Sequence, residues 1–194
     1  MADVIARTER LILRRWAPGD LDLWLAHLNT ADVRAYLGGV QPVDKVAEKF
    51  ATLEQSWEDN GFSFLAVELR EGGTFLGTCG IGRIVTECAP DDLRDAVQIG
   101  WQFRADQWGQ GYATEAARAV LAFGFEQAGL DIIYSQTSSR NLASWGLMEK
   151  LGMKRRADLD YADPDYPPED NPTIVYAIDR EAWRAQAGEA RDVA

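Results

Sequence analysis

A strand, a glycine-bearing turn and a helix follow one another in the middle of the chain. Residues 96–103 (AVQIGWQF) are rich in β-branched and aromatic side chains, which is typical of a strand. From Tyr112 to Ala128, small and apolar residues recur at helical spacing, and Gly129 follows where helices often take a left-handed cap. A helix start exposes backbone N–H groups that attract anions. We therefore predict that Gln107–Thr114 binds a pyrophosphate group.

The identity of this site stays open on local sequence alone. Gly109, Gly111 and Thr114 nearly match the dinucleotide-binding fingerprint. Asp131 lies near the distance expected for its ribose-binding acid, but it precedes an apolar run instead of following the second strand. A nucleotide-binding P-loop is excluded, because no Gly-Lys-Ser/Thr sequence ends the turn. An ordinary strand–helix connection without a ligand is the remaining alternative.

The composition indicates a folded protein with an acidic surface. The 194 residues, 46% of them hydrophobic, are enough for one domain with a substantial core. We expect that domain to span residues 1–194, with its core over about 8–184 and frayed termini. Twenty basic and 31 acidic residues give a net charge of −11. This charge disfavours nucleic acids and anionic membranes and favours a cationic partner such as an amine.

Few residues suit metal or disulfide chemistry. Cys79, Cys88 and the single histidine, His27, do not form a disulfide framework or a structural zinc motif, so we expect no metal. We interpret His27 as an ordinary position on a short helix. No apolar run could span a bilayer, and the N-terminus lacks a signal-like core. We therefore expect a reduced, cytoplasmic protein.

The order of the remaining patterns predicts a mixed α/β sheet. Glycines in the run 74–85 predict a bulge or a close approach to another backbone there. The expected elements are, in order, a strand over 10–16, a helix capped by Asp20, a helix opened by Pro42 and ended by Asn60-Gly61, hairpin strands over 62–70 and 74–85, strand 96–103, helix 112–128, strand 131–137, a helix from Asn141 to Gly152, strand 173–178, and a helix capped by Asp179.

A second informative stretch runs from Asn141 to Met153. Asn141 is a natural helix N-cap, and its amide could alternatively hold amide groups of a ligand. Both interpretations stay open. The two helices that begin at Tyr112 and after Asn141 follow neighbouring strands, so their N-termini would open at one end of the sheet. Such a notch suits a long cofactor that has phosphates at one end and amides further along.

Together these motifs resemble the GNAT superfamily of acetyl-CoA-dependent acyltransferases, and most closely its ribosomal-protein N-terminal acetyltransferase-like subgroup. The resemblance covers nearly the whole chain. It implies an α/β (α+β) fold with a mixed, mostly antiparallel central sheet, flanked by helices and splayed at the cofactor notch. The motifs that carry it are Ile99-Gly-Trp101, Trp108–Ala116, Asn141-x-x-Ser144, Glu149–Met153, Arg10–Arg14 and 175–183.

The resemblance also implies roles for individual residues, with acetyl-CoA as co-substrate and no metal. Backbone N–H groups of the turn would hold the pyrophosphate, strand 101–103 and Asn141 would contact pantetheine, and N–H groups near Gly100 would polarise the thioester carbonyl. Ser144, as the catalytic residue, would protonate the leaving thiolate or donate a hydrogen bond to it. The implied cofactor-binding residues are Trp101, Gln102, Phe103, Gln107, Trp108, Gly109, Gln110, Gly111, Tyr112, Ala113, Thr114 and Asn141.

Three positions depart from the pattern of the superfamily. Met148 stands where many members have a proton-donating tyrosine, Gln98 where the subgroup often has glutamate, and Asp106 where Arg or Gln is frequent. The general base therefore stays unassigned. The leading hypothesis is direct acetyl transfer, in a ternary complex, to a primary amine of a protein N-terminus or a small molecule. The alternative is a catalytically weak coenzyme A-binding sensor or scaffold. A homodimer is left open.

An acidic segment rich in proline lies between the last two strands. It is either a stiff, solvated surface loop or a device that gathers a cationic acceptor. Its acids are Asp158, Asp160, Asp163, Asp165, Glu169 and Asp170.

Overall fold

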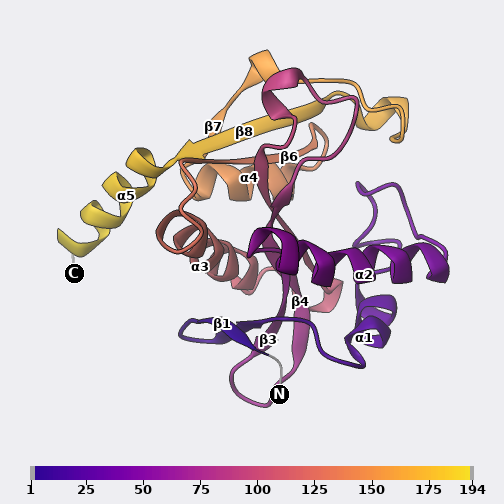
Figure 1. The fold of residues 1–194 in the computed structure, drawn as a ribbon. Coiled ribbons are helices and arrows are strands. Elements are labelled where there is room, and N and C mark those ends of the chain that lie inside the picture. The colour runs from indigo at the N-terminus through magenta and orange to yellow at the C-terminus, as the bar shows by residue number, and fades with distance from the viewer. Residues whose placement is uncertain (1–2, 193–194) are drawn as a thin grey trace. The chain divides into compact units, whose positions relative to one another are not determined.

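The computed structural model describes residues 3–192 and divides the chain into two compact units (Figure 1). Unit 1 comprises residues up to Gly82 together with Ile99–Phe123, and unit 2 comprises Arg83–Gln98 and the chain from Gly124 onward. The chain therefore passes between the units near the end of β4, inside β5 and inside α3.

The sheet of the described residues has the strand order β1-β2-β3-β4-β5-β6-β8-β7. The first four strands belong mostly to unit 1, β5 runs from unit 2 into unit 1, and the others belong to unit 2. β5 and β6 are parallel, with Gln98 beside Tyr134, whereas the other recorded pairs are antiparallel. The strands are β1 (Val4–Arg7), β2 (Leu11–Arg14), β3 (Phe64–Leu69), β4 (Phe75–Arg83), β5 (Val97–Phe103), β6 (Ile132–Ser138), β7 (Lys154–Arg155) and β8 (Thr173–Asp179).

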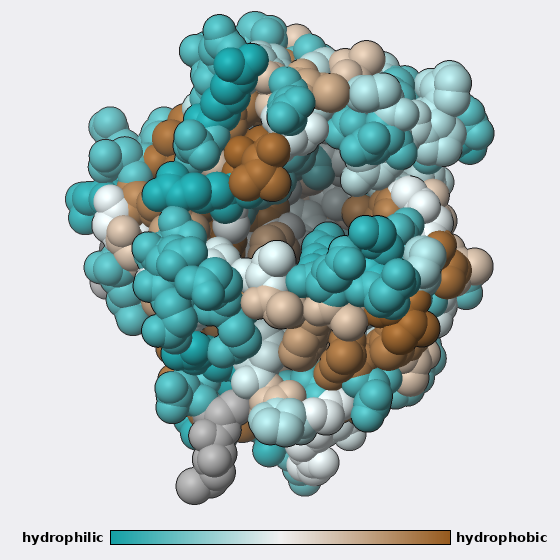
Figure 2. Space-filling view, turned by 45° about the vertical axis from the view of Figure 1, so that its right-hand side comes forward, coloured by the Kyte–Doolittle hydropathy of each residue, from teal (hydrophilic) through white to brown (hydrophobic). Residues whose placement is uncertain are grey.

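Five helices accompany these strands within residues 3–192. They are α1 (Asp20–His27), α2 (Val43–Asn60), α3 (Tyr112–Glu126), α4 (Leu142–Lys150) and α5 (Arg180–Asp192). No helix in this part of the chain is both long and apolar enough to cross a membrane. On the face seen in Figure 2, hydrophobic patches alternate with hydrophilic surface.

Aromatic side chains build the core of unit 1 between the sheet and its two helices. The Trp16 ring lies 5.3 Å from Trp24 of α1, 5.0 Å from Phe50 of α2 and 6.4 Å from Phe75 of β4. Edge-to-face and tilted contacts at these distances add stabilisation beyond simple burial. α1 and α2 are thereby fixed against one face of this unit's sheet (Figure 1).

Unit 2 has a separate core on its own strands. Tyr134 of β6 and Val175 of β8 pack with Ile84 and Leu93 from the segment before β5, and with Leu159 from the connection after β7. Tyr134 and Val175 share a sheet face, because Tyr134 lies opposite Ala177, which is two residues from Val175 on β8.

Most of the expected elements are confirmed, including the mixed, mostly antiparallel sheet. Gly61 and Gly129 have the left-handed φ angles of 73° and 72° that the sequence suggested for helix ends. Three details were wrong. The short strand β7 was not expected. The first strand is Val4–Arg7, a short edge strand that precedes the expected one. The cap of α1 is Gly19, and Asp20 is the first helical residue, where it pairs with Arg14 at 2.6 Å.

Two glycines of β4 allow close approach of other backbones, as predicted. A Cβ atom added at Gly80 would lie 2.2 Å from Phe64 Cα, and one at Gly77 would lie 2.2 Å from the Gln102 carbonyl oxygen. Contacts this short with backbone atoms cannot be relieved by rotating a side chain. The glycines therefore hold β3, β4 and the end of β5 in register.

We expect Gly80→Ala to lower the free energy of unfolding by about 3 kcal/mol, because the added methyl group forces β3 and β4 apart. Urea unfolding followed by circular dichroism measures this. The control is Gly146→Ala on α4, where nothing lies within 4 Å of the added atom. That change should be neutral or stabilising by up to about 1 kcal/mol. Equal losses in the two variants would contradict the steric explanation.

Candidate functional site

The turn between β5 and α3 is shaped by two left-handed glycines. After β5 ends at Phe103, a short 3₁₀ turn covers Ala105–Gln107. Gly109 and Gly111 then have φ angles of 77° and 80°, which residues with a Cβ atom rarely adopt. We call Gln107–Thr114 the glycine loop.

The glycine loop presents backbone donors at a helix start. Glu115 N donates to the Gly111 carbonyl at 3.1 Å and begins the helical pattern. Within residues 3–192, the N–H groups from Gly109 to Thr114 have no recorded hydrogen-bond partner. Unpaired N–H groups at the positive end of a helix dipole favour a phosphate-like anion. The loop therefore presents backbone donors of the kind that such a group accepts.

The acidic residue in front of the loop is neutralised by its neighbour. Arg104 forms an ion pair with Asp106 at 2.7 Å and also donates to the Phe75 carbonyl at 3.2 Å. The hydrogen bond from Arg104 is the main cause that lowers the pKa of Asp106. Asp106 therefore stays ionised, and its charge is matched by that of Arg104.

Trp108 is a large exposed side chain of the loop. Its indole is 54% exposed, and Nε1 donates to the Phe103 carbonyl at 2.8 Å. This hydrogen bond ties the loop to the end of β5.

At the end of β5, the backbone N–H and C=O groups of successive residues point alternately to the two edges of the strand. Arg104 N donates to the Leu76 carbonyl of β4 at 2.9 Å, and the Gln102 carbonyl oxygen lies against Gly77. Since neighbouring residues of a strand point their backbone groups to opposite sides, Trp101 directs its N–H and C=O away from β4. Phe103 does the same, but Trp108 occupies its carbonyl oxygen. Trp101 therefore points its backbone groups to the side of β5 opposite β4.

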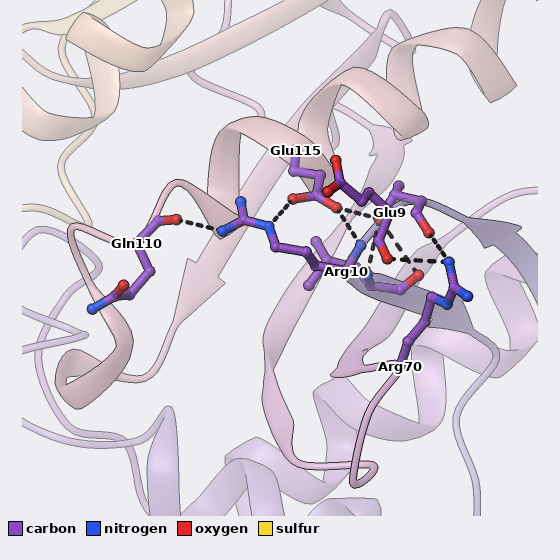
Figure 3. A network of polar contacts seen from close by, with 7 residues as sticks. Glu9, Arg10, Arg70, Gln110 and Glu115 are labelled. Atoms are coloured by element: carbon purple, nitrogen blue, oxygen red, sulfur yellow. Dashed lines mark hydrogen bonds and ion pairs between the residues drawn. The ribbon is translucent and has the colours of Figure 1, made fainter.

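A carboxylate in the first turn of α3 connects the loop to the N-terminal hairpin (Figure 3). Glu115 Oε1 accepts from Thr8 Oγ1 at 2.5 Å and from Arg10 N at 2.9 Å, and Oε2 accepts from Arg10 Nε at 2.7 Å. Partial burial opposes ionisation of Glu115, but these hydrogen bonds outweigh it and lower its pKa. Thr8 was not singled out from the sequence, and Arg10 was named only as part of the Arg10–Arg14 motif, without a role at the site.

Arg10 also contacts the glycine loop itself. Its Nη1 donates to the Gln110 carbonyl at 3.0 Å, and its guanidinium carbon lies 4.7 Å from the centre of the Tyr112 ring. Arg70 supports the hairpin turn, because its Nη1 donates to the carbonyls of Thr8 and Glu9 (Figure 3).

Asn141 and Ser144 lie together in unit 2. Asn141 is the N-cap of α4, and its Oδ1 accepts from Ser144 N at 3.2 Å. Its Nδ2 donates to Thr137 Oγ1 at 3.1 Å. The capping interpretation is thus confirmed, and one N–H and one lone pair of this amide stay available to a ligand. Ser144 is half-buried, whereas Met148 is only 1% exposed.

The predicted site residues divide between the two units. Trp101–Phe103 and the glycine loop belong to unit 1, whereas Asn141 and Ser144 belong to unit 2. Within residues 3–192, no group of three His, Cys, Asp or Glu side chains could hold a metal ion. Cys79 is buried, and its burial raises the pKa of its thiol.

Three of the six acids in the segment before β8 form ion pairs with arginines. Asp163 is buried and accepts from Asp165 N at 3.0 Å, while Asp165 and Glu169 are exposed. These contacts favour a stiff surface loop over a device that gathers cations. The ion pairs are Asp158 with Arg156, Asp160 with Arg155, and Asp170 with Arg140.

Comparisons with known proteins extend over most of the chain. A family model described as "Acetyltransferase (GNAT) domain" matches residues 10–154. The protein YkkB of Bacillus subtilis is 31% identical over 149 residues, which are 75% of this chain and 83% of that protein. The crystal structure of an acetyltransferase from Agrobacterium tumefaciens has a TM-score of 0.73 at 27% identity, covering 90% of this chain and 94% of that one.

RimL, described as a ribosomal L7/L12 alpha-N-protein acetyltransferase and solved in complex with coenzyme A, has a TM-score of 0.73 at 14% identity. The match covers 93% of this chain and 99% of that one. At this identity the likeness shows a common fold.

The lowered pKa of Glu115 makes its contribution to stability dependent on pH. That contribution is complete above the pKa of an unfolded glutamate, near 4.3, and is lost as the pH falls through the lower folded value. We expect Glu115→Gln to cost about 1–2 kcal/mol of unfolding free energy at pH 7. The cost should shrink between about pH 5 and pH 3, as measured by urea unfolding at each pH.

The control for this prediction is Glu58→Gln. Glu58 pairs with Arg15 at 2.7 Å, but its side chain is 65% exposed, compared with 18% for Glu115. An exposed pair contributes about 0–1 kcal/mol, so this variant should differ little from the wild type at any pH. A cost of Glu115→Gln that is the same at pH 7 and pH 3 would contradict the assigned cause.

Proposed function

Because the chain belongs to the GNAT family of acetyltransferases, we propose that it transfers the acetyl group of acetyl-CoA to a primary amine within a ternary complex. The superfamily predicted from the sequence is thereby confirmed, and the chain is an acetyltransferase. The observation that carries the finer proposal is the run of unpaired N–H groups from Gly109 to Thr114. Acetyl-CoA supplies an activated thioester, and the protein residues supply binding and orientation.

The proposed phosphate contacts come from the backbone of the glycine loop. Gly109 and Gly111 have no Cβ atom, so the chain can approach a pyrophosphate closely in a conformation that other residues resist. The dipole of α3 adds attraction for negative charge. The side chains of Gln107, Trp108 and Gln110 would flank this contact.

The proposed pantetheine contacts involve β5 and the start of α4. Trp101 directs its N–H and C=O away from β4, which suits pairing with an amide of an extended ligand as an added strand would pair. The free N–H and lone pair of the Asn141 amide support a second contact of the same kind.

Ser144 is the proposed proton donor to the leaving thiolate. Met148 cannot donate a proton, and its side chain is buried in the core. Ser144 lies one turn earlier on the same helix and is only half-buried. Since no covalent nucleophile is required, we assign most of the rate acceleration to positioning of amine and thioester.

The acceptor is proposed to be a protein N-terminus or a small amine. An overall charge of −11 favours cationic molecules near the surface. Three of the six acids in the segment before β8 are paired with arginines, so this attraction is assigned to the surface as a whole and not to that segment alone.

Thioester turnover tests the proposal. The protein is incubated with acetyl-CoA and a panel of N-terminal peptides, polyamines and aminoglycosides, and free thiol is measured together with acetylated product by mass spectrometry. Release of thiol that depends on an amine would support acetyl transfer. Coenzyme A binding without such release from any amine would favour the sensor alternative.

We expect Ser144→Ala to lower kcat about 100-fold or more, because the thiolate then leaves without a positioned proton donor. KM for acetyl-CoA should stay within about twofold, since the backbone contacts are untouched. The control is Ser139→Ala, which changes an exposed serine just before α4 and should leave both constants unchanged. A normal kcat in Ser144→Ala would remove this serine from the mechanism.

A further inference from the structure

Arg10 contacts one side of a single peptide group in the glycine loop. Its Nη1 donates to the Gln110 carbonyl oxygen at 3.0 Å. In a planar trans peptide, that carbonyl and the N–H of Gly111 point in opposite directions. A hydrogen bond that fixes the carbonyl therefore also fixes the direction of the N–H group, which points away from Arg10.

Arg10 is itself held in one orientation by several contacts. Nε donates to Glu115 Oε2 at 2.7 Å (Figure 3). The guanidinium group also lies over the ring of Tyr112. Thr8 binds the other oxygen of Glu115, and Arg70 N donates to the Arg10 carbonyl at 2.9 Å. The planar guanidinium fork thus bridges a carboxylate of the helix and a carbonyl of the loop.

Without the contact from Arg10, the Gln110–Gly111 peptide could reorient. Gly111 has a φ of 80°, and the nearest atom to a Cβ built there is Nη2 of Arg10, at 3.5 Å. Glycine adopts positive and negative φ with similar ease, so its own conformation does not lock the peptide. A flipped peptide would turn the Gln110 carbonyl oxygen toward the phosphates and repel them.

We propose that Arg10 is a positioning residue for coenzyme A: it orients the Gln110–Gly111 peptide so that the Gly111 N–H points at the pyrophosphate. Glu115 and Thr8 hold Arg10 in place for this purpose. The inference rests on the proposed function. Arg10 lies on the carbonyl side of the peptide, opposite the N–H donor, so it acts through the loop and not by touching the phosphates.

The test compares two ligands that differ in the phosphates. Coenzyme A contains the pyrophosphate, whereas pantetheine lacks it. In Arg10→Gln, Kd for coenzyme A should rise about tenfold, the loss of roughly one hydrogen bond to a charged group. Kd for pantetheine should stay unchanged. Titration calorimetry measures the first ligand and ligand-detected NMR the second, with circular dichroism as a check of folding.

Three further variants sharpen the comparison. Arg10→Lys keeps the charge but cannot bridge Glu115 and Gln110 with one planar group, so it should resemble Arg10→Gln. Glu115→Gln loosens the hold on Arg10 and should raise Kd for coenzyme A about threefold. The matched control is Arg15→Gln, because Arg15 pairs with Glu54 and Glu58 and lies 5.4 Å over Trp57, away from the loop. It should change neither ligand.

The outcomes separate this inference from the proposed function. Equal weakening for both ligands, unchanged coenzyme A binding in Arg10→Gln, or full recovery in Arg10→Lys would each overturn the positioning role. In those cases the wild type still binds coenzyme A, and the proposed function stands. Failure of the wild type to bind coenzyme A would overturn both. If Arg10→Gln does not fold, the same comparison of Kd for coenzyme A and for pantetheine is made in Glu115→Gln, and its result decides between the outcomes.

Discussion

The Glu115 carboxylate lies in the first turn of α3, next to the backbone N–H groups proposed to bind the phosphates of coenzyme A. A glutamate in the first turn of α3 stabilises the helix through its dipole, but its charge would also repel a phosphate bound at the same end. Thr8 and Arg10 resolve this conflict by taking both carboxylate oxygens into hydrogen bonds. The carboxylate then serves to hold the N-terminal hairpin against the loop, and the N–H groups of the loop stay available.

The parts of the structure that local patterns control could be predicted from the sequence. Gly61, Gly129 and the N-cap Asn141 act within one helical turn, so a single sequence contains all that determines them. The glycine loop belongs only partly to the same class, because Gly109 and Gly111 permit its left-handed φ angles, whereas a contact from the distant Arg10 holds one of its peptides. The motifs of the GNAT superfamily then supplied a ligand for a turn that could otherwise have been an ordinary connection.

The parts that depend on distant contacts could not be predicted. Arg10 and Glu115 are 105 residues apart, and nothing in the local sequence of either residue names the other. An acid at a helix start that is proposed to bind phosphate needs a neutralising cation, so a partner for Glu115 could have been expected. The sequence contains several arginines, however, and does not indicate which one pairs with it. Arg104, in contrast, pairs with a residue close to it in the sequence. Asp106, two residues away, stands where the superfamily often has Arg or Gln, and its negative charge is neutralised by the ion pair with Arg104.

These two pairs define how the loop can attract phosphates in a protein of net charge −11. Arg10 with Glu115 and Arg104 with Asp106 are each neutral overall, so neither arginine offers an unmatched positive charge to a ligand. Under the proposed function, the loop itself would attract phosphates through N–H dipoles, which act over a few ångströms and are screened little by salt at contact distance. Such a site depends on the direction of each N–H group far more than a lysine-rich site would. This kind of site requires a residue such as Arg10, which is proposed to orient one peptide of the loop without contacting the phosphates.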